Sequence, residues 1–567
     1  MNVPQLDFFI NNKIKSLTQL LHQESVANIQ FQLLEFSHHC FCRGLSSQAI
    51  RAADLANSIK KRTVEVWLQE TVFNPPFKFL HPTTACEIDL YLRTKNSFER
   101  KAYREAISLG LCSTNPVIRF LSLYSSYLRE TEAPNTENFS FTRELPKQAT
   151  RKADLSFLRR ELKVLYDKNR LDPFELYLFG LVLKEDKDHK AAVSVFVEAL
   201  GIYPEFYDCW MELAALLADK LTKVELPNHW MRLFYEAALA SERLKYEKSL
   251  RCCEILHDFF PVSSLLIAQK ALCLYNMRLF EEALLVFAEL RFKDPYRLDC
   301  IDRLSDIFYV KGDKVQLSYL AHDVARIDKY RPETCCVIGN FYSLRSNHDK
   351  AVLYFTRALL FKSSCFFAWT LMGHEYMELK FPSKAINCYL RALEANNKDF
   401  RAWYGLGQAF EILDMYDYAL FYYRRACLLR PSDGRMWLAL ASSYELLGMF
   451  LEAIQCYEAA AKDEEVSLLS TCRLAQMCSH LKMKDRAAKN FMRVLQDTNV
   501  QDDEEMENYK IKACLYLARY FFDRKKYSLS KEFAERIFNW NKREKEEAKA
   551  ILQDIMTRSV NCVNKGV

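Results

Sequence analysis

Tryptophan recurs at a constant interval in this chain, at Trp369, Trp403 and Trp437. The surroundings of each tryptophan repeat too, because a small residue lies sixteen positions after each one, at Ala385, Ala419 and Ala453. A period of thirty-four is typical of two short antiparallel helices that stack on similar neighbours. Stacked helix pairs bury one continuous core and display a long concave face, which suits the binding of other proteins. The period therefore predicts an α-helical solenoid.

The same frame extends well beyond the three tryptophans. An aromatic residue fills the space between the two helices four positions after the small one, and it can be followed through Phe287, Phe355, Tyr389, Tyr423, Tyr457 and Phe491. Small residues of the first helix, which let the helices approach, lie at Ala271, Gly339, Gly373, Gly407, Ala441 and Ala475. This is the pattern of the tetratricopeptide repeat (TPR). We predict an all-α TPR superhelix with seven in-phase repeats.

Outside the in-phase part the repeat weakens, and the pattern divides the chain into five segments. They are 1–130, with irregular TPR-like helices; 131–150, a polar loop or linker with two prolines; 151–263, TPR-like repeats with a loop near 220–228; 264–501, the seven in-phase repeats; and 502–567, an acidic insert, a last helix pair and a capping helix.

Charge and cysteine content exclude several functions. The 79 basic and 73 acidic residues are interspersed, so we expect no nucleic-acid binding. No stretch approaches the roughly 18 apolar residues of a membrane helix, so we expect no membrane partner.

The 19 cysteines include no C-x-x-C pair, and with no signal peptide this favours a reducing nuclear or cytosolic compartment. His38, His39, Cys40 and Cys42 point in different directions on a helix, so we expect no metal site and no cofactor.

No phosphate-binding loop or nucleophile motif is visible, which argues against an enzyme. The concave face is the better candidate site, and its inner positions in the repeat frame, with one neighbour at the edge, are Asn340, Thr370, His374, Glu375, Glu378, Tyr404, Gln408 and Glu411. The basic residues that hold a carboxylate in co-chaperone TPR clamps are missing. Carboxylates beside an aromatic ring suit an arginine-bearing peptide instead. The alternative, weighed evenly for Glu411 and Glu445, is that these are solvated charges on a helix face.

Several strings carry more than the TPR frame requires. DKYRPETCCVIGNFYSLRSNHDKAVLYFTRAL (328–359), AWTLMGHEYMELK (368–380) and RAWYGLGQAFEILDM (401–415) closely resemble the family of the eighth subunit of the anaphase-promoting complex, or cyclosome, the cell-division-cycle twenty-three type. The similarity is traceable upstream through LYLFGLVLKEDKDHKAAVSVFVEAL (176–200) and is least clear in 1–130.

This resemblance implies a non-catalytic scaffold subunit of a multi-subunit ubiquitin ligase that controls mitosis. It further implies a homodimer formed through the N-terminal repeats, contacts with other subunits, and a groove for the arginine-containing box of the activator subunit. We expect such a protein in nucleus and cytoplasm. Two alternatives remain: a generic TPR adaptor outside the ubiquitin system, and a repeat-protein enzyme, which would need a catalytic domain for which the repeats leave no room.

Overall fold

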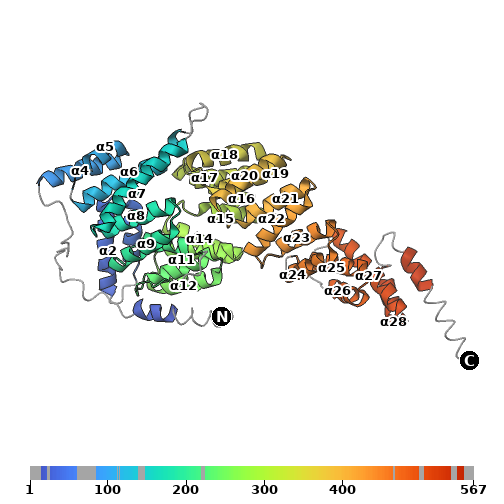
Figure 1. Ribbon diagram of the computed structural model, residues 1–567. Coiled ribbons are helices and arrows are strands. Elements are labelled where there is room, and N and C mark those ends of the chain that lie inside the picture. Colours follow the sequence, from blue (N-terminus) through green and yellow to red (C-terminus); the bar gives the residue numbers. More distant parts are fainter. Residues whose placement is uncertain are drawn as a thin grey trace, which may run out of the picture. The chain divides into compact units, whose positions relative to one another are not determined.

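The computed structural model describes residues 14–21, 26–59, 85–110, 113, 115–137, 147–218, 224–463, 466–496, 504–537 and 546–553 (Figure 1). All regular secondary structure in these ranges is helical, and many consecutive helices pair across short turns, for example α8 with α9 and α19 with α20. The all-α TPR class predicted from the sequence is confirmed. The chain forms two compact units, one of Met1–Leu344 with Leu360–Ser363 and one of Arg345–Leu359 with Ser364–Val567.

The first unit contains a helix at 14–21 and α2 (Val26–Cys42), α3 (Ser46–Asn57), α4 (Ala85–Glu99), α5 (Tyr103–Gly110), α6 (Pro116–Glu137), α7 (Lys147–Asp167), α8 (Pro173–Glu185), α9 (His189–Ile202), α10 (Tyr207–Leu217), α11 (Arg232–Glu242), α12 (Tyr246–Phe259), α13 (Ser264–Asn276), α14 (Phe280–Lys293), α15 (Ile301–Lys311), α16 (Lys314–Ile327) and α17 (Pro332–Leu344).

The second unit contains most of α18 (His348–Phe361), then α19 (Phe366–Glu378), α20 (Pro382–Ala395), α21 (Phe400–Ile412), α22 (Tyr416–Leu429), α23 (Gly434–Leu446), α24 (Phe450–Ala460), α25 (Ser467–His480), α26 (Lys484–Gln496), α27 (Glu504–Asp523), α28 (Tyr527–Ile537) and a helix at 546–553. The helix pairs of this unit are α19/α20, α21/α22, α23/α24, α25/α26 and α27/α28.

The turn inside each helix pair has a fixed backbone conformation. One residue per turn has a positive φ of 57° to 75°, and these residues recur with the repeat period at Leu244, Arg278, Gly312, Ser346, Lys380, Asp414, Gly448 and Lys482. Such φ values are uncommon outside glycine. Because only two of the eight are glycines, the turn register is imposed by the packing of the helices on either side. The turn between α11 and α12, at Leu244, lies in the same phase as the later turns.

Where a second helix carries the aromatic residue of the frame, that residue lies at the centre of its repeat. Tyr389 is fully buried, and a Cβ atom added at Gly373 would lie 2.4 Å from its ring. A Cβ at Gly405, on the first helix of the next repeat, would lie 2.5 Å from the same ring. The glycines are therefore required by the close approach of α19 and α21 to one tyrosine.

Two of the repeating tryptophans connect a first helix to the loop before it. The indole Nε1 of Trp403 donates to the carbonyl of Asn397 at 2.9 Å, and that of Trp437 donates to Pro431 at 2.8 Å. Trp210 makes the same bond to Pro204, far upstream. In all three cases the acceptor is six positions earlier, so the tryptophan fixes the start of the helix as well as filling space.

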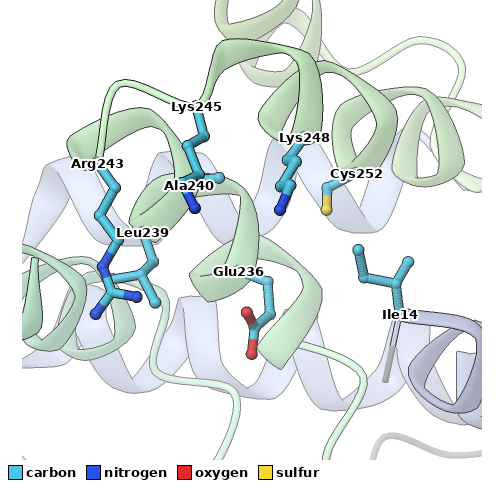
Figure 2. Close-up of a pocket in the computed structure, with 8 residues that line it drawn as sticks. All are labelled: Ile14, Glu236, Leu239, Ala240, Arg243, Lys245, Lys248 and Cys252. Carbon is cyan, nitrogen blue, oxygen red and sulfur yellow. The ribbon is translucent and has the colours of Figure 1, made fainter. Parts of the chain in front are cut away.

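The N-terminal segments do not form a separate core. Phe36 of α2 lies in one hydrophobic cluster with Phe174, Trp230 and Leu266. Ile267, the residue after Leu266, belongs to another hydrophobic cluster, which also contains Ala271 and Phe287. Ile14 of the first helix also packs against α11 and α12, where Figure 2 shows it beside Glu236, Lys248 and Cys252 at a small pocket.

Three segments expected to be irregular can be compared with the described residues. The stretch 131–150 was expected to be a loop or linker, but both of its ends are helical. Helix α6 continues to Glu137, and α7 begins at Lys147. Residues 138–146 lie outside the described residues. Composition is a weak guide to helix ends. The acidic insert is partly helical, because α27 begins at Glu504. Between α10 and α11 residues 224–229 form no helix, while 219–223 lie outside the described part.

Candidate functional site

Three of the eight predicted site residues are buried and hydrogen-bonded to other side chains of this protein. Asn340, in the first unit, is 2% exposed and donates from Nδ2 to Ser305 Oγ at 2.9 Å. Thr370, in the second unit, is 1% exposed and donates to Asp399 Oδ2 at 2.8 Å. Asp399 also accepts from the backbone N–H of Arg401, so it caps α21. These two side chains position neighbouring helices.

Glu375 is the third of these residues and lies deeper than the sequence suggested. We expected it at the edge of the inner face, but it is 4% exposed, and its Oε2 lies 2.8 Å from Nδ1 of His348 at the start of α18. The rotation of a helix about its axis is set by its neighbours, and the residue next to an inner position can therefore point into the core. His348 was missed, because no repeat position singles it out.

The other five residues reach solvent, and all lie in the second unit. Glu378, in the last turn of α19, is exposed, and His374, Tyr404, Gln408 and Glu411 are half-buried. Gln408 is hydrogen-bonded to Tyr404, whose ring lies 5.5 Å from that of Tyr423. Burial is the main cause that raises the pKa of Tyr404, so this ring stays neutral at physiological pH.

Three buried tyrosines hold polar side chains of the first helices. Tyr389, Tyr423 and Tyr457 occupy the same position of successive repeats, and their hydroxyl groups reach His374 at 2.8 Å, Glu411 at 2.5 Å and Glu445 at 2.7 Å. We call these three the tyrosine series. Burial raises the pKa of all three phenols, so each stays protonated. The other repeats from α13 to α26 have phenylalanine or alanine at this position and cannot make the bond.

The tyrosine series distinguishes Glu411 and Glu445 from ordinary surface charges. Each carboxylate uses one oxygen for a bond to a buried donor, and this restricts its rotation. The geometry thus favours fixed carboxylates over freely solvated ones at these two positions. The sequence contains a signal for these bonds, since tyrosine replaces phenylalanine in three successive repeats, but the repeat frame alone assigns the position to packing.

The described residues contain no group of three or more His, Cys, Asp and Glu side chains placed to hold a metal ion. In the cluster at 38–42, Cys40 is fully buried and its Sγ contacts Oε1 of Gln48 at 3.8 Å. No helix in the described ranges is both long and apolar enough to cross a bilayer.

Comparison with known proteins gives consistent matches. A family model described as anaphase promoting complex subunit 8 / Cdc23 matches residues 28–271, and two tetratricopeptide repeat models match 370–427 and 434–462. The family match thus covers the part of the chain in which the repeat pattern is weakest.

Curated relatives cover most of the chain. It is 43% identical over 476 residues to "Anaphase-promoting complex subunit 8" of Arabidopsis thaliana, with 83% of this chain and 82% of the relative covered. It is 45% identical over 404 residues to the protein of that name in Dictyostelium discoideum, with 70% and 68% covered. It is 31% identical over 360 residues to "Anaphase-promoting complex subunit CDC23" of Saccharomyces cerevisiae, with 52% and 58% covered. With its TPR architecture and these relatives, the chain belongs to the anaphase-promoting complex subunit 8/Cdc23 family.

Proposed function

We propose that this protein is a non-catalytic scaffold subunit of an anaphase-promoting complex, a ubiquitin ligase that acts in mitosis in nucleus and cytoplasm. Its partners are the other subunits, a second copy of itself, and the activator subunit. Family membership supports the assembly role, because the relatives named above are subunits of that complex. Catalysis would belong to the partner subunits.

We further propose that the first helices of the second unit bind the arginine-containing box of the activator. The observation that carries this proposal is the bond from Tyr423 to Glu411 beside the half-buried ring of Tyr404. A guanidinium can form paired hydrogen bonds to a carboxylate and stack on an aromatic ring. Glu411 and Tyr404 would supply these two interactions to an arginine side chain. Glu378 and Gln408 supply additional acceptors.

The buried residues contribute differently under this proposal. Glu375, Thr370 and Asn340 are positioning residues, because their polar atoms bond to His348, Asp399 and Ser305. Replacing Glu375 by lysine would bury a cation beside His348 and disturb the fold. It is therefore a poor test of peptide contact, and exposed carboxylates serve better.

The peptide site can be tested by fluorescence polarisation with a labelled peptide containing the arginine box. Glu411→Gln should weaken binding about tenfold, because one charged acceptor is lost. Glu394→Gln, an exposed glutamate of α20, is the matched control with the same change of charge. Equal affinity of the two variants would reject Glu411 as a contact.

The scaffold role is tested separately, by affinity purification of the full chain from its own cells followed by mass spectrometry. We expect the other subunits of the complex to co-purify. Recovery of the chain with a different set of proteins would support the alternative of a generic TPR adaptor, and would reject the scaffold role.

A further inference from the structure

A polar pocket lies near the C-terminal end of the second unit. It has a volume of about 260 Å³ and is bounded by α25, α26, α27 and the helix at 546–553. Its apolar side is well ordered by packing: the rings of Phe491 and Tyr516 have centroids 4.8 Å apart, and Leu515 is 8% exposed. Tyr516 is also hydrogen-bonded to Ser479 of α25. The pocket therefore has a fixed aromatic floor.

The rim of this pocket is basic. His480, Lys512 and Arg519 are exposed and line it. Counting from Ala518 as the small residue at position eight of its helix, Arg519 occupies inner position nine of α27. The same position in α19, α21 and α23 holds a histidine, a glutamine and a serine, namely His374, Gln408 and Ser442. Arg519 thus places a permanent positive charge where those helices have no such charge, so this end of the array suits a ligand of negative charge.

A carboxylate of this chain already sits at the rim. Oε2 of Glu547, in the helix at 546–553, accepts a hydrogen bond from Nη2 of Arg519 at 2.8 Å. That helix is held against α27 by Ala548, which is fully buried with Ile511 and Cys514. Both charged side chains of the pair are more than half exposed, at 62% and 57%, so the pair itself is weak and exchangeable.

We infer that this pocket binds an acidic peptide segment of a partner protein, whose carboxylate takes the place of Glu547 on Arg519. Lys512 and His480 lie on the same rim and give a second carboxylate a place to bind, and an apolar side chain of the peptide can lie on the aromatic floor. This site is separate from the proposed arginine-peptide site, and its ligand has the opposite charge.

The test uses a fluorescein-labelled hexaglutamate peptide and the full chain, in low salt, with polarisation as the readout. Arg519→Glu should weaken binding at least tenfold, since it replaces attraction by repulsion. Glu547→Gln should strengthen binding several-fold, because the competing carboxylate is removed. Arg536→Glu, on α28 and paired with Glu532, is the matched control and should change binding less than twofold.

Equal losses for Arg519→Glu and Arg536→Glu would show attraction to net charge only and would overturn the inference. An unchanged affinity of Glu547→Gln would also overturn it, because no displacement would then occur. Circular dichroism of each variant checks that the helices are retained. Failure here is distinguishable from failure of the proposed function, because Glu411→Gln should leave hexaglutamate binding intact and Arg519→Glu should leave binding of the arginine peptide intact.

Discussion

The hydroxyl of Tyr423 on α22 lies 2.5 Å from Oε2 of Glu411 on α21, and this bond links the buried centre of a repeat to its inner face. Tyr423 is fully buried and Glu411 is half-buried. A core packing residue is therefore hydrogen-bonded to a candidate binding residue. A substitution of the core residue should consequently change the affinity for a ligand.

We predict that Tyr423→Phe weakens binding of the arginine-box peptide about fivefold, because Glu411 loses the donor that fixes its carboxylate, a bond worth about 1 kcal/mol. The measurement is fluorescence polarisation. Tyr418→Phe on the same helix, where the side chain is 56% exposed, should bind as the native chain does. If both variants bind alike, the tyrosine series has a purely structural role.

Gly373→Ala should destabilise the second unit, since its Cβ would lie 2.4 Å from the ring of Tyr389. Overpacking of this kind costs about 2 kcal/mol. Thermal unfolding followed by circular dichroism reports this as a lower midpoint. Gly201→Ala in α9 is the contrasting variant, because nothing lies within 4 Å of its added Cβ. That change should stabilise the chain slightly, by about 0.5 kcal/mol. A neutral Gly373→Ala would show that Tyr389 can move aside.

Arg43→Ala should loosen the attachment of α2 to α8. The Arg43 side chain is 3% exposed, pairs with the capping residue Asp172 and lies over the ring of Phe174. Removing one member of a buried pair costs about 3–5 kcal/mol. Hydrogen–deuterium exchange of the amides of α2 should accelerate strongly.

The control for this variant is Arg93→Ala, which removes an exposed pair with Asp89 on α4. It should cost less than about 0.5 kcal/mol and leave exchange in α2 unchanged. Similar exchange in the two variants would mean that apolar contacts alone hold α2 in place.

Acidification should weaken the start of α11 through His229. Burial lowers the pKa of His229 to about 4 from 6.5, and its Nδ1 accepts a hydrogen bond from the backbone N–H of Met231. The unfolded chain binds the proton more tightly, so the contribution of the neutral histidine is present above pH 6.5 and is lost as pH falls towards 4. Between pH 7 and 5 the loss is about 2 kcal/mol.

Thermal unfolding of the native chain and of His229→Gln at several pH values tests whether stability falls on acidification. The difference between the two should change with pH, and the native chain should lose more stability on acidification. Parallel pH profiles would mean that the pKa of His229 does not differ between the folded and unfolded states.

Local and periodic features were predictable from the sequence. The small and aromatic positions near Ala385 and Tyr389 recur with the same period as the tryptophans, and each lies in the core as the frame requires. The site was less predictable. Inner positions such as Glu378 and Gln408 do reach solvent, but Glu375 is buried on His348, a partner on another helix that no motif marks.

By itself the sequence determined the helix pairs, their register and the family, because apolar period and family-specific strings are local properties of the chain. Only the tertiary structure decided which polar side chains are held in place, since that depends on helix rotation and on donors from neighbouring helices. The bond from Tyr423 to Glu411 and the burial of Glu375 are both of this kind. So is the packing of α2 into the core around Phe174, which joins segments that lie far apart in the chain.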